Sequence, residues 1–246
     1  MKIRKRAFSL ISLLGVTFLV YCCSLTYQDE VILAKELPIG MHVKNQQQIK
    51  LDDLAESLIE GGKKALYGTD GIMRNYEIAY ELFAQAEHLG STETYYYLGL
   101  MYDEGYYVEE DNGQAYFWYE KSANEGYATS MNKLGMLYYK GEGVAADYAK
   151  AMEYYEMAVA KGNTSAMNNI GMMYHSGIGV VQSYETAMEW FVKAAEAGNA
   201  SAMYNVACYY YYGFGVNKDT EQALSWAKKA LAEGYTAAQD LIQVCE

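Results

Sequence analysis

The apolar residues of this chain follow a helical spacing that returns every 36 residues over most of its length. Within the segment 127–140, apolar side chains three and four positions apart form one stripe, which predicts an amphipathic helix. The stripe consists of Met131, Leu134, Leu137 and Tyr138. The segment 148–160 predicts a second helix, whose buried face is formed by Ala151, Tyr154, Tyr155 and Ala158. One unit of the repeat is therefore expected to be a pair of helices.

Glycines and capping side chains mark where each predicted helix begins and ends. Gly141 follows the last turn of the first helix, where glycine adopts the left-handed conformation that a Cβ would penalise. Asp147 precedes the second helix, and a carboxylate at this position accepts hydrogen bonds from free backbone N–H groups. The equivalent residues of the other units are Asp111, Ser183 and Asp219. Gly162 ends the second helix, and Asn163 or Thr164 is expected to cap the next first helix.

Several positions keep the same kind of residue from one unit to the next. Glycine recurs at 99, 135 and 171, with Ala207 in the fourth place, and small residues there let the two helices of a unit approach closely. Tyrosine recurs at 102, 138, 174 and 210, and alanine at 115, 151, 187 and 223. A fixed period of this length predicts a solenoid, in which each unit buries its apolar face against its neighbours. The predicted fold is an all-α, right-handed α-solenoid of stacked helix-turn-helix repeats.

These columns form a recognisable motif. One unit carries it as Leu134, Gly135, Tyr138, Gly141, Gly143, Val144, Asp147, Lys150, Ala151 and Gly162. The next unit carries Ile170, Gly171, Tyr174, Gly177, Gly179, Val180, Ala187, Trp190 and Gly198 at matching positions. The motif resembles the Sel-one-like repeat family, a relative of the tetratricopeptide repeats, and this resemblance implies a scaffold that binds other proteins. Three residues depart from the family pattern: Tyr107 and Ala207 stand in place of glycine, and Ser183 in place of aspartate.

The chain is predicted to consist of an N-terminal segment followed by repeats. Residues 1–27 are a signal peptide or membrane anchor, and residues 28–50 are a polar tether. Residues 51–90 form a degenerate first repeat, in which Gly62 and Gly68 have the spacing of Gly99 and Gly105 and one residue is inserted further on. The regular repeats are 91–126, 127–162, 163–198 and 199–234, and residues 235–246 form a C-terminal capping helix. Atypical terminal units cover the open ends of a solenoid.

The first residues have the composition of an export signal. Lys2, Arg4, Lys5 and Arg6 precede an uncharged, largely apolar run from Ala7 to Gln28. A bilayer is spanned by about 20 residues, and Cys22 follows residues similar to a lipoprotein signal. Three interpretations stay open: a cleaved signal peptide, an uncleaved anchor formed by residues 7–27, and a lipidated cysteine. In each case the repeats are expected outside the cytoplasm, periplasmic or secreted, because basic flanks stay inside.

Acidic residues dominate the remainder of the chain. All 31 of them lie beyond the N-terminal segment, which holds four of the 19 basic residues, so the remainder carries a formal charge of −16. Nucleic acid is not expected as a partner, because binding to phosphates requires Lys and Arg. A basic protein or peptide is the better electrostatic match, although solubility explains the acidic surface equally well. Membrane contact is expected only through the N-terminal segment.

The sequence carries no motif for catalysis or for a cofactor. His42, His88 and His175 are far apart, and no group of Cys and His residues has metal-ligand spacing. No nucleophile motif or phosphate loop is present, so we expect no cofactor, no metal and no enzymatic activity. Cys208 and Cys245 lie on first helices of adjacent units, where a packed free thiol is the first expectation and a disulfide the alternative.

The candidate binding residues lie on the first helices, on the face turned away from the second helix. In related repeats the first helices line the concave surface, so the resemblance places a peptide-binding groove there. The groove residues are Tyr96, Asn132, Tyr139, Asn168, His175, Tyr204 and Tyr211. Tyr and Met side chains provide adaptable contacts, and Asn132 and Asn168 are expected to hold a peptide backbone by bidentate hydrogen bonds. Packing between stacked first helices is the alternative explanation.

Two functions remain in view. The favoured one is an exported, non-enzymatic adaptor that binds a protein or peptide, of unknown identity, in its concave groove. The alternative is an exported hydrolase acting on cell-wall or β-lactam substrates, for which exported relatives of the family are the precedent. The hydrolase requires a clustered acid, base or nucleophile.

Circular dichroism of residues 28–246 is expected to show a spectrum dominated by helix, because paired helices account for nearly all of the repeat region. A substantial contribution from strand would contradict the predicted solenoid.

Overall fold

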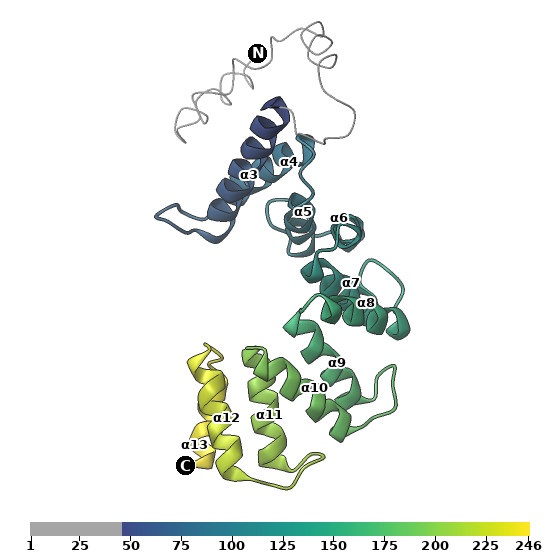
Figure 1. The fold of residues 1–246 in the computed structure, drawn as a ribbon, viewed down its shortest axis with the longest axis vertical. Coiled ribbons are helices and arrows are strands. Elements are labelled where there is room, and N and C mark those ends of the chain that lie inside the picture. Colours follow the sequence, from purple (N-terminus) through teal and green to yellow (C-terminus); the bar gives the residue numbers. More distant parts are fainter. Residues whose placement is uncertain (1–45) are drawn as a thin grey trace, which may run out of the picture. The chain divides into compact units, whose positions relative to one another are not determined.

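The computed structural model describes residues 46–246, and this part of the chain folds into α-helices with no strand (Figure 1). The first helices of the units are α3 (Gln46–Tyr67), α5 (Thr94–Asp103), α7 (Ala128–Lys140), α9 (Thr164–Ser176) and α11 (Ala200–Tyr212). The second helices are α4 (Tyr76–His88), α6 (Asn112–Asn124), α8 (Tyr148–Ala160), α10 (Tyr184–Glu196) and α12 (Thr220–Ala232), and α13 (Ala238–Cys245) ends the chain. Each helix packs against the next along the chain, so the predicted all-α repeat solenoid is confirmed.

The predicted signal or anchor, residues 1–27, and residues 28–45 of the tether lie outside the described residues. The last part of the tether differs from the prediction, because α3 already begins at Gln46 and residues 46–50 are helical. Residues 46–60 contain no Gly or Pro and many residues of good helix propensity, which explains the longer helix. Among the described residues, no helix is both long enough and apolar enough to cross a membrane.

The predicted helix ends are confirmed by the backbone. Asp147 accepts a hydrogen bond from the N–H of Lys150 at 3.1 Å, and Asn163 accepts one from Ala166 at 2.8 Å. The other predicted capping residues, Asp111, Ser183 and Asp219, cap their helices in the same way. Gly141 follows α7 with φ of 74°, in the left-handed region. At these positions the local signals set where a helix begins or ends.

The two helices of a unit are held close together by a glycine on the first helix that faces an aromatic ring on the second. A Cβ at Gly135 would lie 2.5 Å from Cε1 of Tyr155, so no side chain fits there, as the sequence predicted. The same arrangement pairs Gly62 with Phe83, Gly99 with Tyr119, and Gly171 with Phe191, and all four rings are buried. Gly62 therefore occupies the helix-contact position of the degenerate first unit.

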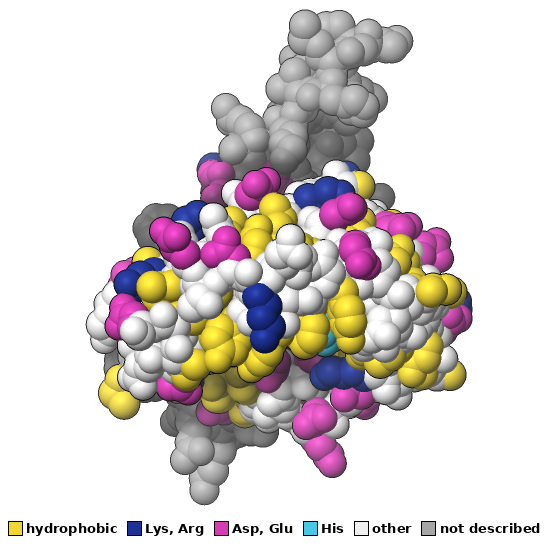
Figure 2. Space-filling view, turned by 90° about the horizontal axis from the view of Figure 1, so that it is seen from below, with side chains coloured by type: hydrophobic (Ala, Val, Ile, Leu, Met, Phe, Trp, Pro, Cys, Tyr) yellow, Lys and Arg dark blue, Asp and Glu magenta, His cyan; other side chains and the backbone are white. Residues whose placement is uncertain are grey.

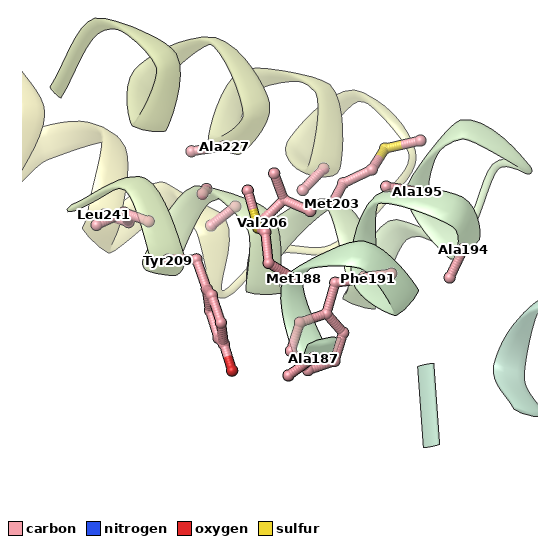
Figure 3. Close-up of a cluster of buried hydrophobic side chains, with 14 of the residues drawn as sticks. Ala187, Met188, Phe191, Ala194, Ala195, Met203, Val206, Tyr209, Ala227 and Leu241 are labelled. Atoms are coloured by element: carbon pink, nitrogen blue, oxygen red, sulfur yellow. The ribbon is translucent and has the colours of Figure 1, made fainter. Parts of the chain in front are cut away.

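In the last pair, both partners of this contact change together. Ala207 replaces the glycine, and Ala227 stands where the other units have an aromatic ring. Both alanines are fully buried, in the cluster that also contains Phe191, Val206 and Leu241 (Figure 3). A larger residue on the first helix is thus matched by a smaller one on the second. This exchange explains why the departure at Ala207 leaves the fold intact.

Neighbouring units also meet where the turn between the helices of one unit approaches the start of the second helix of the unit before it. Gly143 has φ of 71°, and a Cβ there would collide with the backbone oxygen of Asn112. Gly179 and Gly215 make equivalent approaches to Tyr148 and to Glu185. Tyr107 occupies this position in the 91–126 unit with φ of 70°, and its ring lies against Tyr80. Its side chain stands at a position that favours glycine.

The contact between Gly135 and Tyr155 is testable by a double-mutant cycle. Gly135→Ala overpacks the contact and is expected to lower the free energy of unfolding by about 1–3 kcal/mol. Tyr155→Ala leaves a cavity and is expected to lower it by about 3–5 kcal/mol. The double variant recreates the Ala207–Ala227 pair of the last unit. Its loss of unfolding free energy, measured by urea unfolding, is therefore expected to be smaller than the sum of the losses of the two single variants. Additivity within about 0.5 kcal/mol would show that the two residues do not share this space.

The turn contact is testable with two glycines of similar conformation. Gly143 and Gly162 have φ of 71° and 83°, but a Cβ at Gly162 meets no atom within 4 Å. Both alanine substitutions introduce left-handed strain of about 1–2 kcal/mol, and only Gly143→Ala adds the collision with Asn112. Thermal unfolding is therefore expected to show a larger loss of stability for Gly143→Ala than for Gly162→Ala. Equal losses would mean that the turn can move away without cost.

Candidate functional site

Asparagine side chains link the first helices of three consecutive units. Nδ2 of Asn169 donates to Oδ1 of Asn132 at 2.9 Å, and Nδ2 of Asn205 donates to Oδ1 of Asn168 at 2.8 Å. We call this set the amide ladder: Asn132 on α7, Asn168 and Asn169 on α9, and Asn205 on α11. The ladder runs from unit to unit along the face on which the sequence placed the groove.

The amide ladder corrects the predicted role of Asn132 and Asn168 in one respect. Each of these carbonyl oxygens already accepts a hydrogen bond from the next unit, and Asn132 is buried, with 7% of its surface exposed. A bidentate pair to a peptide would therefore share an oxygen with the neighbouring helix. Asn169 and Asn205 were missed by the sequence analysis, although they follow the selected column by one residue.

The amide ladder retains hydrogen-bonding capacity. Within the described residues, the side-chain amide nitrogen of Asn168 donates no hydrogen bond, and the side-chain oxygens of Asn169 and Asn205 accept none. These three side chains are partly exposed. An amide can donate two hydrogen bonds and accept two, so the ladder presents both donors and acceptors to solvent.

Methionine side chains lie beside the amide ladder. Sδ of Met136 is 3.9 Å from Nδ2 of Asn132, and Sδ of Met172 is 3.9 Å from Nδ2 of Asn205. Met172 is 43% exposed, whereas Met136 is partly buried. An exposed thioether next to amide groups offers an adaptable apolar contact.

The tyrosines predicted to line the groove are all partly buried, and each packs against another aromatic ring. Tyr139 packs edge-on against Tyr148 at 5.7 Å, and Tyr211 against Tyr212 at 5.0 Å. Tyr204 lies 5.0 Å from Tyr235. Burial raises the pKa of Tyr204 to about 12, with a smaller contribution from its hydrogen bond to Cys208. Tyr96 lies between Tyr97 and Tyr119, and burial raises its pKa to about 12 as well.

His175, one of the predicted groove residues, lies within an aromatic cluster. Its Nδ1 is 2.7 Å from the hydroxyl of Tyr209, on the first helix of the next unit. The rings of Tyr184 and Phe214 lie 5.4 and 5.9 Å from the imidazole and stack on each other. This histidine therefore contributes to the contact between two units, whatever else it binds.

A charged cavity of about 230 Å³ opens beside Met136, between the carboxyl end of α5 and residues 133–140 of α7. Asp103, Glu104, Glu110 and Glu142 line it together with Lys133 and Lys140, and Met136 and Leu137 contribute apolar surface. Nζ of Lys133 lies 2.7 Å from Oδ2 of Asp103, which also accepts a hydrogen bond from the buried Tyr119 at 2.9 Å. The six charged residues give the cavity a formal charge of −2.

A second hollow lies between α6 and α8. It has a volume of about 390 Å³ and is lined in part by Tyr116, Glu120, Glu153 and Tyr154. The hydroxyl of Tyr116 donates to Glu120 at 2.7 Å and shares a hydrogen bond with Tyr138. Tyr138 also stacks on Tyr154, so the aromatic side chains of this hollow contact one another.

The described residues show neither a metal-holding cluster nor an activated cysteine. No group of three or more His, Cys, Asp or Glu side chains in this part of the chain could hold a metal ion. Cys208 and Cys245 are free thiols, and burial raises the pKa of both. A nucleophilic cysteine needs a lowered pKa, so neither has the character of an activated thiol.

The helix pairs, the glycine contacts and the exposed first-helix face define a helical-repeat scaffold. The chain belongs to the Sel1 repeat family, whose model matches residues 62–91, 92–127, 128–163, 164–199 and 200–235. The resemblance seen in the sequence is therefore confirmed. Sel1 repeat proteins are generally non-catalytic scaffolds that bind other proteins. No curated protein matches this chain.

Solved structures share the fold. A Sel1 repeat protein from Oxalobacter formigenes is 28% identical, with a TM-score of 0.68, and the match covers 76% of this chain and 74% of that one. The protein c5321, a protective antigen present in uropathogenic Escherichia coli strains, is 30% identical with a TM-score of 0.64. That match covers 80% of this chain but 43% of the E. coli protein, so this chain spans less than half of its length. The immunity protein Pa5087 from Pseudomonas aeruginosa, 20% identical with a TM-score of 0.56, is similar in fold.

Proposed function

We propose that this protein is an exported adaptor that binds an extended protein segment along the first-helix face. The observation that carries this proposal is the amide ladder, whose free donors and acceptors lie on consecutive units. An extended peptide has unpaired N–H and C=O groups along its length, and asparagine amides complement both. Side chains of the segment would contact Met172, Tyr139 and Tyr211.

The spacing of the ladder suits an extended chain. Packed helices lie about 8–10 Å apart, and an extended chain advances about 3.3 Å per residue. One unit therefore corresponds to about three residues of a bound segment. A bound helix would keep its backbone groups in internal hydrogen bonds and would leave the ladder without partners.

Export rests on the N-terminal sequence. Four basic residues followed by an uncharged apolar run are typical of export signals. The similar protein c5321 of E. coli is a protective antigen. Three outcomes would each put the repeats outside the cytoplasm: cleavage of the signal, retention as an anchor over residues 7–27, and lipidation at Cys22.

The proposed surface can be tested with peptides selected from a random peptide display library on the immobilised full-length protein. Tyr139→Ala combined with Tyr211→Ala is expected to weaken these peptides by about 1–2 kcal/mol per residue, the range of interface anchors. Binding is measured by fluorescence anisotropy, and circular dichroism verifies that the fold is retained.

The matched control is Phe117→Ala combined with Met157→Ala. These two side chains lie on second helices and are 47% and 42% exposed. The control is expected to leave peptide binding unchanged. Loss of binding in the control, with normal binding by the Tyr139 and Tyr211 variant, would place the binding surface on the second helices instead.

A further inference from the structure

We infer that the charged cavity beside Met136 accepts an arginine side chain of the bound segment. This inference rests on the proposed function and adds the chemistry of the partner. It depends on the shape of the cavity, on the pairing of its charges and on its position next to the amide ladder.

The cavity has room for a long side chain. Its volume is about 230 Å³, and water occupies about 30 Å³ per molecule in the liquid, so several waters would be displaced. Met136 and Leu137 provide an apolar wall. The aliphatic stem of arginine packs on such a surface while its guanidinium reaches polar groups.

The two lysines of the cavity leave its four carboxylates with a net formal charge of −2. Lys133 lies 2.7 Å from Asp103 and 3.7 Å from Glu104, and Lys140 lies 3.2 Å from Glu142. Within the described residues, Glu110 forms no ion pair, and the side chain of Glu104 is 44% exposed. Glu110 therefore remains available to a cation, while Glu104 shares Lys133 with the closer carboxylate of Asp103. The planar guanidinium of arginine matches carboxylate geometry better than the ammonium of lysine does.

The position of the cavity connects it to the amide ladder. Met136 lines the cavity and contacts the amide of Asn132, so a segment on the ladder passes its edge. Met172, one unit further, is exposed beside Asn205. With about three residues per unit, the preferred segment carries arginine and, three positions away, an apolar side chain.

The test uses the full-length protein and peptides selected from the same random display library. Selected peptides are expected to be enriched in arginine with an apolar residue three positions away. Glu104→Gln combined with Glu110→Gln is expected to weaken an arginine-containing peptide about tenfold at low salt. The difference is expected to shrink in about 1 M salt, where the Debye length is about 3 Å.

Two controls make the charge effect specific. Glu120→Gln combined with Glu153→Gln removes the same charge from the hollow between α6 and α8. It is expected to change affinity less than about twofold, because these two glutamates do not line the cavity beside Met136. A peptide whose arginine is replaced by glutamine is expected to bind both double variants equally.

The outcomes separate this inference from the proposed function. Peptides without enriched arginine that still depend on Tyr139 and Tyr211 would overturn the inference and leave the adaptor role standing. Equal weakening by the two glutamate pairs would also overturn it, because the effect would then be one of total charge. Failure to select any peptide would contradict the proposed function and the inference together.

Discussion

The close contact between a glycine on one helix and an aromatic ring on the next sets the distance between the two helices of each unit. Where the first helix has no side chain, the ring of the second helix fills the space, as Tyr155 does opposite Gly135. Protein interiors are packed as densely as organic crystals, so neither partner can change alone. The last unit exchanges both, with Ala207 opposite Ala227. The constraint is therefore on combined volume rather than on glycine itself.

The stacking of units depends on a second set of close contacts. The turn glycines Gly143, Gly179 and Gly215 bring each turn against the second helix of the preceding unit. Hydrogen bonds between the first helices also link neighbouring units. Asn169 on α9 bonds to Asn132 on α7, and Lys133 on α7 bonds to Asp103 on α5. Because each unit contacts its neighbours in this way, the exposed faces of consecutive first helices lie next to one another.

This arrangement gives the first-helix face its character. On the one face of the molecule that Figure 2 shows, acidic, hydrophobic and basic side chains are intermixed, and no broad patch of a single kind stands out there. The distinguishing features are local: amides with free hydrogen-bonding groups, an exposed methionine, and a charged cavity with an apolar wall. Several of these residues also connect adjacent units. A bound segment and the packing of the array therefore depend on some of the same side chains.

The sequence alone determined the helix pairs, their caps and the family, because these follow from short-range rules. Periodicity identifies a buried face, Asp147 caps the helix that follows it, and Gly141 ends the helix before it. Sequence also indicated the first-helix face as the candidate surface. It could not show that Asn132 and Asn168 are engaged by Asn169 and Asn205, or that His175 is packed among aromatic rings. Nor could it reveal the cavity beside Met136, or the link between Ala207 and Ala227. These features join residues up to 39 positions apart in the sequence, such as Asp103 and Glu142 of the cavity. Only the packing of helices decides which of them meet.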